Sequence, residues 1–195
     1  MEKPESCDVG IEVDGYYTGL SKQQMDFQDA LAELVDNAIS ANISSEDYFE
    51  EENPDESFDI EINIVRNEGD TVEVIVADSG EGIDPETLSS HIWKSGDRSQ
   101  AGGILNEHGF GLKNSLSVLT KNEGEEPFKI ISRTSEYEDD EFAVVKGPIG
   151  RDMPIEYIED SDLWEEGAGT LTDMSTGTRV HLETDMDVVR STYRR

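Results

Sequence analysis

The stretch Glu33-Leu-Val-Asp-Asn-Ala-Ile-Ser-Ala41 decides the fold of this chain. Apolar residues recur around it three and four positions apart, which predicts a helix with one face packed on a sheet; they are Phe27, Leu31, Leu34, Val35, Ala38 and Ile39. Glu33 and Asn37 are four residues apart, so their side chains meet on one side of that helix. An amide oxygen can bind a magnesium ion, and a carboxylate one turn away can take a proton from a nearby water. An ordinary amphipathic helix whose polar face carries Glu, Asp and Asn is the alternative interpretation.

The composition describes a folded domain with an acidic surface. The chain has 195 residues, enough for one domain with a hydrophobic core and a short appendage. It carries 46 Asp and Glu against 15 Lys and Arg, a net charge of −31, which disfavours direct nucleic-acid binding through Lys and Arg patches. The charge suits a salt-loving source, because at ~1 M ionic strength the screening length falls to about 3 Å. An acidic surface that imitates DNA is the alternative.

Cysteine usage and hydropathy indicate the compartment. The single cysteine, Cys7, allows no internal disulfide and makes a reducing interior the default. The first residues lack an apolar signal segment, and no apolar run approaches the ~20 residues of a membrane span. We therefore expect a cytoplasmic protein that does not enter a membrane.

The order of patterns along the chain gives the expected domain organisation. Residues 1–22 form an N-terminal arm, and Ser21 is a candidate cap for the helix that runs to about Asn42. The domain itself is expected over residues 23–185. Residues 186–195, which end in basic side chains, are expected to begin a linker to a missing or separate C-terminal region.

Alternating apolar residues predict the sheet. Two such segments, 58–64 and 72–76, flank the turn Asn67-Glu-Gly-Asp70 and predict a β-hairpin. Further strands are expected over residues 128–133, 141–145, 155–158 and 178–182, separated by Gly and acidic turns. Together the elements predict an α/β (α+β) two-layer sandwich, with a mixed, largely antiparallel sheet and the helices on one face.

A second motif, Asp78-Ser-Gly80-Glu-Gly82-Ile83, follows the second strand of the hairpin. Glycine lets the backbone approach a ligand closely and accepts positive φ angles. A carboxylate at a strand end can accept a hydrogen bond from an exocyclic amine such as that of adenine, which would orient a base in an apolar site. The alternative is a plain acidic turn, whereas an EF-hand is excluded because its other ligands are missing.

A third motif, Gly109-Phe110-Gly111-Leu112-Lys113, opens another helix after a polar, Gly-rich loop over residues 94–108. Exposed N–H groups at a helix N-terminus form a natural phosphate site, and a long loop inside a compact domain is often a functional lid. Lys94 and Lys113 are the nearby lysines that can reach a phosphate. For Lys113 a solvated helix face is the alternative.

In this order the motifs resemble the ATP-binding domain shared by DNA gyrase, a heat-shock chaperone, histidine kinases and MutL, the GHKL superfamily. Glu33-Leu-Val-Asp-Asn37 resembles its N box, Asp78 to Gly82 its first Gly box, and His108-Gly109-Phe-Gly111-Leu its second. Gly177-Thr178-Arg-Val resembles its late strand. The Gly-Phe-Gly-Leu-Lys-Asn-Ser run is closest to MutL-type and MORC-type members.

The resemblance implies a Bergerat-type fold, with ATP and Mg²⁺ as cofactors and the following site residues. Glu33 would be the general base and Asn37 the magnesium ligand. Asp78 would read adenine, Gly80, Gly82 and Ile83 would line its site, and Thr178 would help hold Asp78 and a water. Gly109, Phe110, Gly111 and Leu112 would hold phosphates beneath the lid, with Lys94 and Lys113 nearby.

The resemblance also implies a mode of action. Glu33 points to the hydrolysing branch, so we expect slow ATP hydrolysis used as a conformational or dimerisation switch, with an ATP-dependent homodimer as one form. Such ATPases receive a cation for the γ-phosphate from a following transducer domain, which this chain would need from elsewhere. Two alternatives stay open: a nucleotide-binding interaction module without turnover, and a non-catalytic acidic partner protein whose glycines are only turns.

Overall fold

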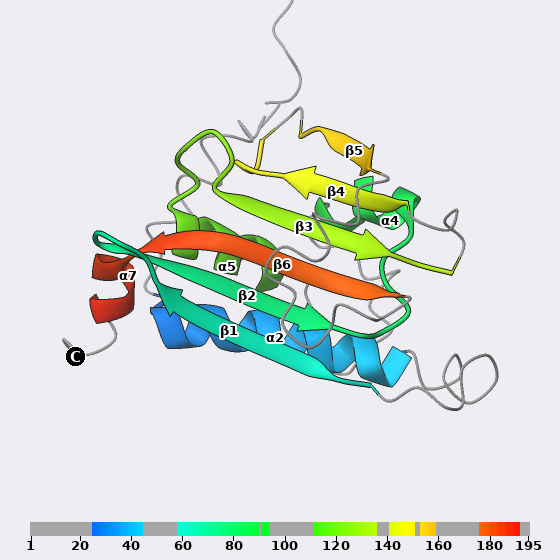
Figure 1. The fold of residues 1–195 in the computed structure, drawn as a ribbon, viewed down its shortest axis with the longest axis horizontal. Helices are drawn as coiled ribbons and strands as arrows, with labels where there is room; N and C mark the ends of the chain where they lie inside the picture. The colour runs from blue at the N-terminus through cyan, green and yellow to red at the C-terminus, as the bar shows by residue number, and fades with distance from the viewer. Residues whose placement is uncertain are drawn as a thin grey trace, which may run out of the picture.

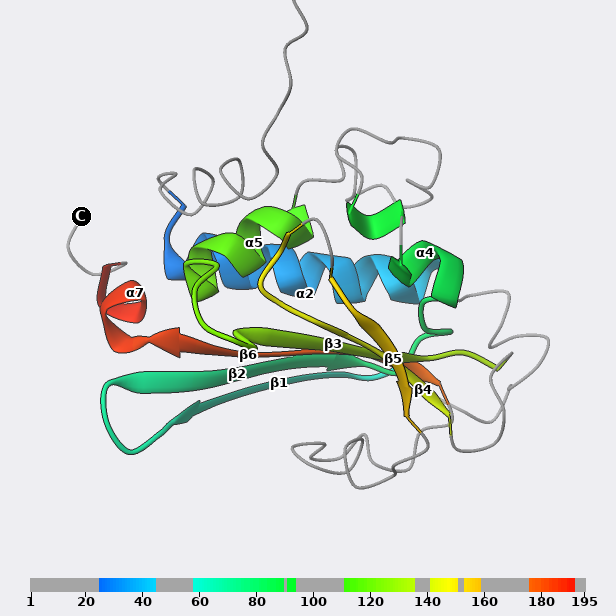
Figure 2. The ribbon, with the colours of Figure 1, turned by 90° about the horizontal axis from the view of Figure 1, so that it is seen from above.

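A computed structural model describes residues 25–44, 58–89, 91–93, 111–135, 141–150, 153–158 and 176–191. These residues form two layers, a sheet and a set of helices that lie together on one face of the sheet (Figure 1, Figure 2). The predicted α+β sandwich is therefore confirmed. Lys94, Gly109, Phe110 and the expected lid lie outside the described residues.

The sheet has six strands in the order β1-β2-β6-β3-β4-β5. Every neighbouring pair of described strands is antiparallel, whereas a mixed, largely antiparallel sheet was expected. The last strand in the sequence, β6, lies between β2 and β3 and joins the N-terminal hairpin to the rest of the sheet. The bounds are β1 Ile60–Arg66, β2 Thr71–Asp78, β3 Phe128–Arg133, β4 Phe142–Lys146, β5 Ile155–Ile158 and β6 Gly177–Asp185.

The predicted hairpin is formed by β1 and β2. Its register runs from Ile60 opposite Asp78 to Arg66 opposite Val72. Gly69 in the turn has φ +109°, a left-handed conformation that favours glycine. The hairpin thereby brings Asp78 to the end of β2, where it pairs with Thr178 of β6.

Two longer helices and three short ones cover one face of the sheet; they are α2 (Phe27–Ser44), α4 (Pro85–Ser89), the 3₁₀ turn η1 (His91–Trp93), α5 (Gly111–Thr120) and α7 (Met186–Ser191). Asp26 caps α2, because its Oδ1 accepts the N–H groups of Gln28 and Asp29 at 3.0 Å. The prediction of Ser21 as the cap of this helix was therefore wrong. No helix in the described ranges is long and apolar enough to span a membrane.

The main core lies between the helices and the sheet. Val72, Val74 and Val76 alternate along β2 and are all buried beneath α2. Leu116 and Leu119 of α5 fill the adjoining space over β6 and β3 with exposed fractions of at most 1%. The helix-facing side of the sheet is thus apolar along its length and turns polar where the strands end at Asp78.

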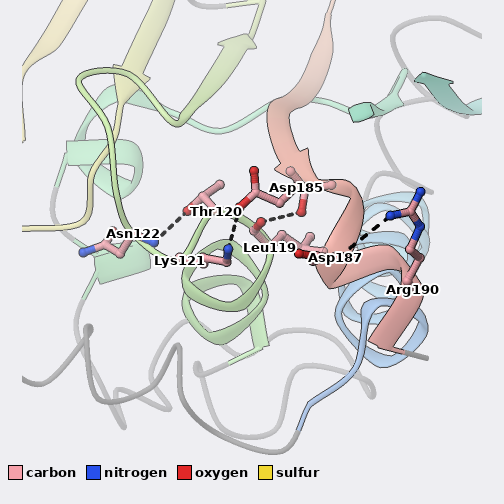
Figure 3. A network of polar contacts seen from close by, with 8 residues as sticks. Leu119, Thr120, Lys121, Asn122, Asp185, Asp187 and Arg190 are labelled. Atoms are coloured by element: carbon pink, nitrogen blue, oxygen red, sulfur yellow. Dashed lines mark hydrogen bonds and ion pairs between the residues drawn. The ribbon is translucent and has the colours of Figure 1, made fainter. Parts of the chain in front are cut away.

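Polar contacts fix the C-terminal end of α5 to the end of β6 (Figure 3). The Thr184 hydroxyl donates to the carbonyl of Leu119 at 2.6 Å, and the Lys121 ammonium pairs with Asp185. Asn122 N–H donates to the Thr120 hydroxyl at 3.1 Å and closes the helix end. Because α5 is held at this end, the direction of its first turn is set by the sheet.

The C-terminal part of the described chain differs from the expectation of a linker at residue 186. Met186–Ser191 forms α7, and Met186, Val188 and Val189 pack against the main core. The backbone N–H of Met186 donates to the carbonyl of Asp70 in the β1–β2 turn at 2.6 Å. The apolar residues of this segment, rather than its basic end, therefore determine its packing.

Candidate functional site

The first part of the site joins α2 and α5, which pack against each other. Glu33 lies against the first residue of α5: a Cβ atom added at Gly111 would stand 2.2 Å from Glu33 Oε2. Glycine is therefore required at position 111 for the carboxylate to keep this place. Among the described residues, no ion pair involves Glu33. The carboxylate thus lies beside the N-terminal end of α5, and backbone N–H groups at a helix N-terminus favour anions.

Asn37 lies one turn after Glu33 on the same side of α2. Its Nδ2 atom is buried and has no hydrogen-bond partner, whereas its Oδ1 atom is not among the buried polar atoms that lack one. The amide is thus oriented with nitrogen toward the protein and leaves its oxygen as the ligand atom that a hard cation prefers. This donor fits a magnesium ion, and Asn37 is the residue of α2 that would hold it.

Asp78 forms the second part of the site. Its side chain points to the helix side of the sheet, because it continues the alternation of Val74 and Val76 along β2. Asp78 is 7% exposed, and burial raises its pKa to about 7, against the opposing effect of the backbone N–H groups of Gly80 and Thr178. The N–H of Gly80 donates to Asp78 Oδ1 at 3.0 Å. A buried carboxylate with remaining acceptor capacity can bind a donor from a ligand.

The loop after Asp78 is held to the sheet by Ser132, a residue that the motifs did not predict. Ser132 is fully buried on β3, and its hydroxyl accepts the N–H of Ile83 at 2.7 Å. The same hydroxyl lies 3.1 Å from the Thr178 hydroxyl and donates to the carbonyl of Gly177. The predicted residues Ile83 and Thr178 are therefore brought together through Ser132.

Two glycines allow this loop its close approach to the strands. Gly82 has φ +81°, and a Cβ at this position would lie 2.0 Å from the carbonyl oxygen of Arg133. Gly177 has φ +142°, and its Cβ would lie 2.2 Å from the carbonyl oxygen of Asp78. Both neighbours are backbone atoms that cannot move aside cheaply, so both positions need glycine.

Lys113 is buried rather than solvated. It is 1% exposed, its Nζ donates to the carbonyl of Ile92 at 2.7 Å, and burial lowers its pKa to about 8. The alternative of a solvated helix face is therefore wrong. Trp93 Nε1 donates to the carbonyl of Leu88 at 2.8 Å. Hydrogen bonds therefore join α5 to η1 and η1 to α4. Leu112, the residue before Lys113, packs against the main core.

The described site residues form two groups on the helix side of the sheet. One joins Glu33 and Asn37 of α2 with Gly111 of α5. The other joins Asp78 with Gly80, Gly82, Ile83 and Thr178 at the end of β2.

A comparison with protein families supports a family assignment. The model of the histidine kinase-, DNA gyrase B-, and HSP90-like ATPases matches residues 25–146. That range includes every site residue named above except Gly177 and Thr178. No curated protein matches the chain.

Proposed function

The chain belongs to the family of histidine kinase-, DNA gyrase B-, and HSP90-like ATPases, and on that basis we propose that it binds Mg-ATP and hydrolyses it slowly as a conformational or dimerisation switch. Family membership supports ATP binding and ATPase activity in general. The assignment of single residues, the magnesium dependence, the switch and the MutL-type or MORC-type affinity are the finer part of the proposal.

The observation that carries the hydrolysis proposal is the place of Glu33. Its carboxylate lies against Gly111 at the start of α5, where the N–H groups of a helix N-terminus would bind phosphate oxygens. From there Glu33 would take a proton from the attacking water. Magnesium, when bound at Asn37, would polarise the phosphoryl group. A Glu33 held away from this helix end by an ion pair would have favoured a module that binds without turnover.

Asp78 supports the choice of an adenine nucleotide. Its ionised carboxylate would accept a hydrogen bond from the exocyclic amine, while Gly80, Gly82 and Ile83 form the adjoining loop. Thr178 lies on the paired strand and would support Asp78 and a water. A guanine base presents a carbonyl oxygen at the corresponding position. That oxygen and the Asp78 carboxylate are both hydrogen-bond acceptors, so they would repel each other.

Slow turnover follows from the scarcity of cations. Phosphoryl transfer develops negative charge that needs fixed positive groups besides magnesium. Lys113 has its ammonium on the carbonyl of Ile92, and Lys94 is the other lysine proposed to reach a phosphate. We propose that Gly109 to Leu112 bind the phosphates and that a transducer domain or partner protein supplies a further lysine.

Isothermal titration with ATP and magnesium in high salt tests this proposal. We expect ATP to bind, GTP to bind much more weakly, and removal of magnesium to weaken ATP binding. Glu33→Gln should keep the affinity while steady-state turnover falls by ~10²–10⁴-fold, as is typical when a general base is lost. Absence of ATP binding would refute the function, and equal turnover of both proteins would refute the role of Glu33.

A further inference from the structure

The β1 edge of the sheet carries an apolar surface that is unusual in so acidic a chain. Among the described large hydrophobic residues, the exposed ones are Ile39, Ile62, Ile64, Val65 and Tyr157, and all but Tyr157 lie on α2 or β1. Ile62 and Ile64 are 46% and 47% exposed. An exposed apolar patch on an edge strand is a typical interaction site.

Ile62 and Ile64 point to the helix side of the sheet. Ile62 lies opposite Val76 and Ile64 lies opposite Val74 in the antiparallel pair, and opposite residues share a face. Those valines are buried in the main core, whereas the two isoleucines lie on the edge strand and stay exposed.

The neighbouring side of α2 is apolar as well. Leu31, Val35 and Ile39 are spaced by four residues and form one stripe on the helix. Successive residues of a helix are rotated by about 100°, so Val35 lies nearly opposite Glu33, which faces α5. Because α2 lies over β1 and β2 and α5 lies over β6 and β3 (Figure 1), the stripe faces the β1 edge.

The backbone of β1 is oriented to add a strand at this edge. Toward β2, Ser79 N–H donates to the carbonyl of Asp59, and Asn67 N–H donates to the carbonyl of Thr71. The backbone groups of Asp59 and Asn67, both odd-numbered, therefore point toward β2. Because the register between them is regular, the backbone groups of residues 61, 63 and 65 point toward β2 as well. The N–H and C=O groups of Ile62 and Ile64 point outward, beyond the edge of the described sheet.

We propose that the β1 edge pairs with the β1 edge of a second copy of this chain, antiparallel and centred on Asn63. In this register Ile62 lies opposite Ile64 of the second copy, and the outward backbone groups of these residues bond to each other. The pairing is isologous, as a two-fold dimer requires.

The charges of β1 itself do not oppose a second copy at this edge. Residues 60–66 contain one carboxylate, Glu61, and in this register Glu61 faces Val65 of the second copy rather than a carboxylate. The two-fold axis places both α2 helices on the same face of a continuous sheet, with their Ile39 stripes toward each other. Since each chain carries a net charge of −31, the dimer should strengthen as salt screens the repulsion.

The pairing would connect assembly to the nucleotide. The stripe Leu31, Val35 and Ile39 lies on the same helix as Glu33 and Asn37, on its opposite side. This coupling rests on the proposed function, whereas the pairing itself does not. If ATP binding fails but dimerisation persists, the proposed function falls and the edge pairing stands.

Sedimentation of the 195-residue chain in high salt, with and without Mg-ATP, tests the pairing. We expect a dimer for the wild type and a monomer for Ile64→Lys at concentrations where the wild type is dimeric. Tyr157→Lys is the matched control, because Tyr157 is 50% exposed on β5 at the other edge of the sheet. Circular dichroism checks that both variants are folded. A wild type that stays monomeric at every soluble concentration, or an Ile64→Lys protein that dimerises like the wild type, would overturn the proposal.

Disulfide trapping tests the register. In a Cys7→Ser background, Asn63→Cys should form a covalent dimer on oxidation, because opposite residues of a non-hydrogen-bonded pair have Cα atoms about 4.5 Å apart, within disulfide range. Val65→Cys on the same strand should not, since Val65 faces Glu61 of the second copy. A dimer trapped at position 65 and not at 63, or docking of the N-terminal arm at this edge in place of a second copy, would refute the centred pairing.

Discussion

The buried carboxylate of Asp78 opposes the stability of the fold near neutral pH. Burial raises its pKa from 3.8 to about 7, so the folded protein holds a proton that the unfolded chain releases. The free energy of unfolding therefore falls as the pH rises from about 4 to about 7, and the loss is complete above pH 7.

Asp78→Asn should separate stability from binding. The amide keeps an oxygen for the N–H of Gly80 and removes the buried charge. Above pH 7 we expect the variant to be more stable than the wild type by up to about 4 kcal/mol, with the difference shrinking toward pH 4. The same change presents an N–H donor to the adenine amine, so ATP binding should be lost. Urea unfolding at pH 5 and pH 8 and titration with ATP measure the two effects; unchanged ATP affinity would contradict the adenine assignment.

Nucleotide affinity should depend on pH through the same group. Only the ionised form of Asp78 accepts a hydrogen bond from the adenine amine on both of its oxygens, and its pKa of about 7 places this change near neutrality. We therefore expect affinity for ATP to rise between pH 6 and pH 8, with proton release on binding. Titration calorimetry in two buffers of different ionisation enthalpy detects the released proton. A pH-independent affinity in this range would contradict the prediction.

Gly111 provides a test of Glu33 that leaves Glu33 in place. A Cβ at position 111 would displace the tip of the Glu33 side chain, which is flexible and can move without unfolding the helix pair. We expect Gly111→Ala to lose most of its turnover, as Glu33→Gln does, and ATP titration measures how far the added methyl group also weakens phosphate binding. Combining Gly111→Ala with Glu33→Gln should cost little further activity, because both changes remove one function. Independent, multiplicative losses in the double variant would show that the two residues act separately.

At the scale of elements, Ser132 joins β3, β6 and the loop after β2. Its hydroxyl serves the N–H of Ile83, the carbonyl of Gly177 and the hydroxyl of Thr178 in one buried place. The loop on one side of the candidate adenine site is therefore positioned by a residue from a strand that follows it by some fifty residues in the chain.

Ser132→Ala should destabilise the protein and loosen this loop. The change leaves the Ile83 N–H without its acceptor, and an unsatisfied buried polar group costs about 1–3 kcal/mol. ATP affinity should fall with it. Ser117→Ala is the matched control, because the buried Ser117 hydroxyl on α5 has no hydrogen-bond partner within the described structure. Thermal unfolding and ATP titration of both variants measure the changes in stability and in ATP affinity. Equal changes in the two variants would mean that the Ser132 hydrogen bonds add neither stability nor affinity.

For the whole molecule, the net charge of −31 sets the conditions of stability. The turn before β3 alone exposes Glu123, Glu125 and Glu126. Repulsion among exposed carboxylates opposes the compact state and weakens as salt shortens the screening length.

Salt should therefore stabilise the protein strongly. Raising potassium chloride from ~0.1 M to ~1 M shortens the screening length from about 10 Å to about 3 Å, so the melting temperature should rise over this range. Sucrose at matched viscosity is the control for effects that do not depend on charge. A melting temperature that stays constant with salt would remove the argument for a salt-loving source.

Local patterns in the sequence were enough to predict most of the described helices and strands. The hairpin, the strands and the helices around Glu33 and after Gly111 follow from periodicities and turn residues that act within a few positions, and the family match agrees with the motifs they carry. The expected cap at Ser21 was wrong, because Asp26 caps α2 instead. Residues 186–191, where a linker was expected to begin, form the short helix α7. Both differences lie at element ends, where a single side chain or one turn of apolar residues changes the outcome.

Which of these residues meet depends on the tertiary fold. The insertion of β6 between β2 and β3 brings Thr178 beside Asp78 and Ser132, and the packing of α5 on α2 places Gly111 against Glu33. Lys113 occurs in a polar run, yet the fold buries its ammonium against the carbonyl of Ile92. These contacts join residues far apart in the chain, and burial, desolvation and pairing energies depend on that packing rather than on neighbours in sequence.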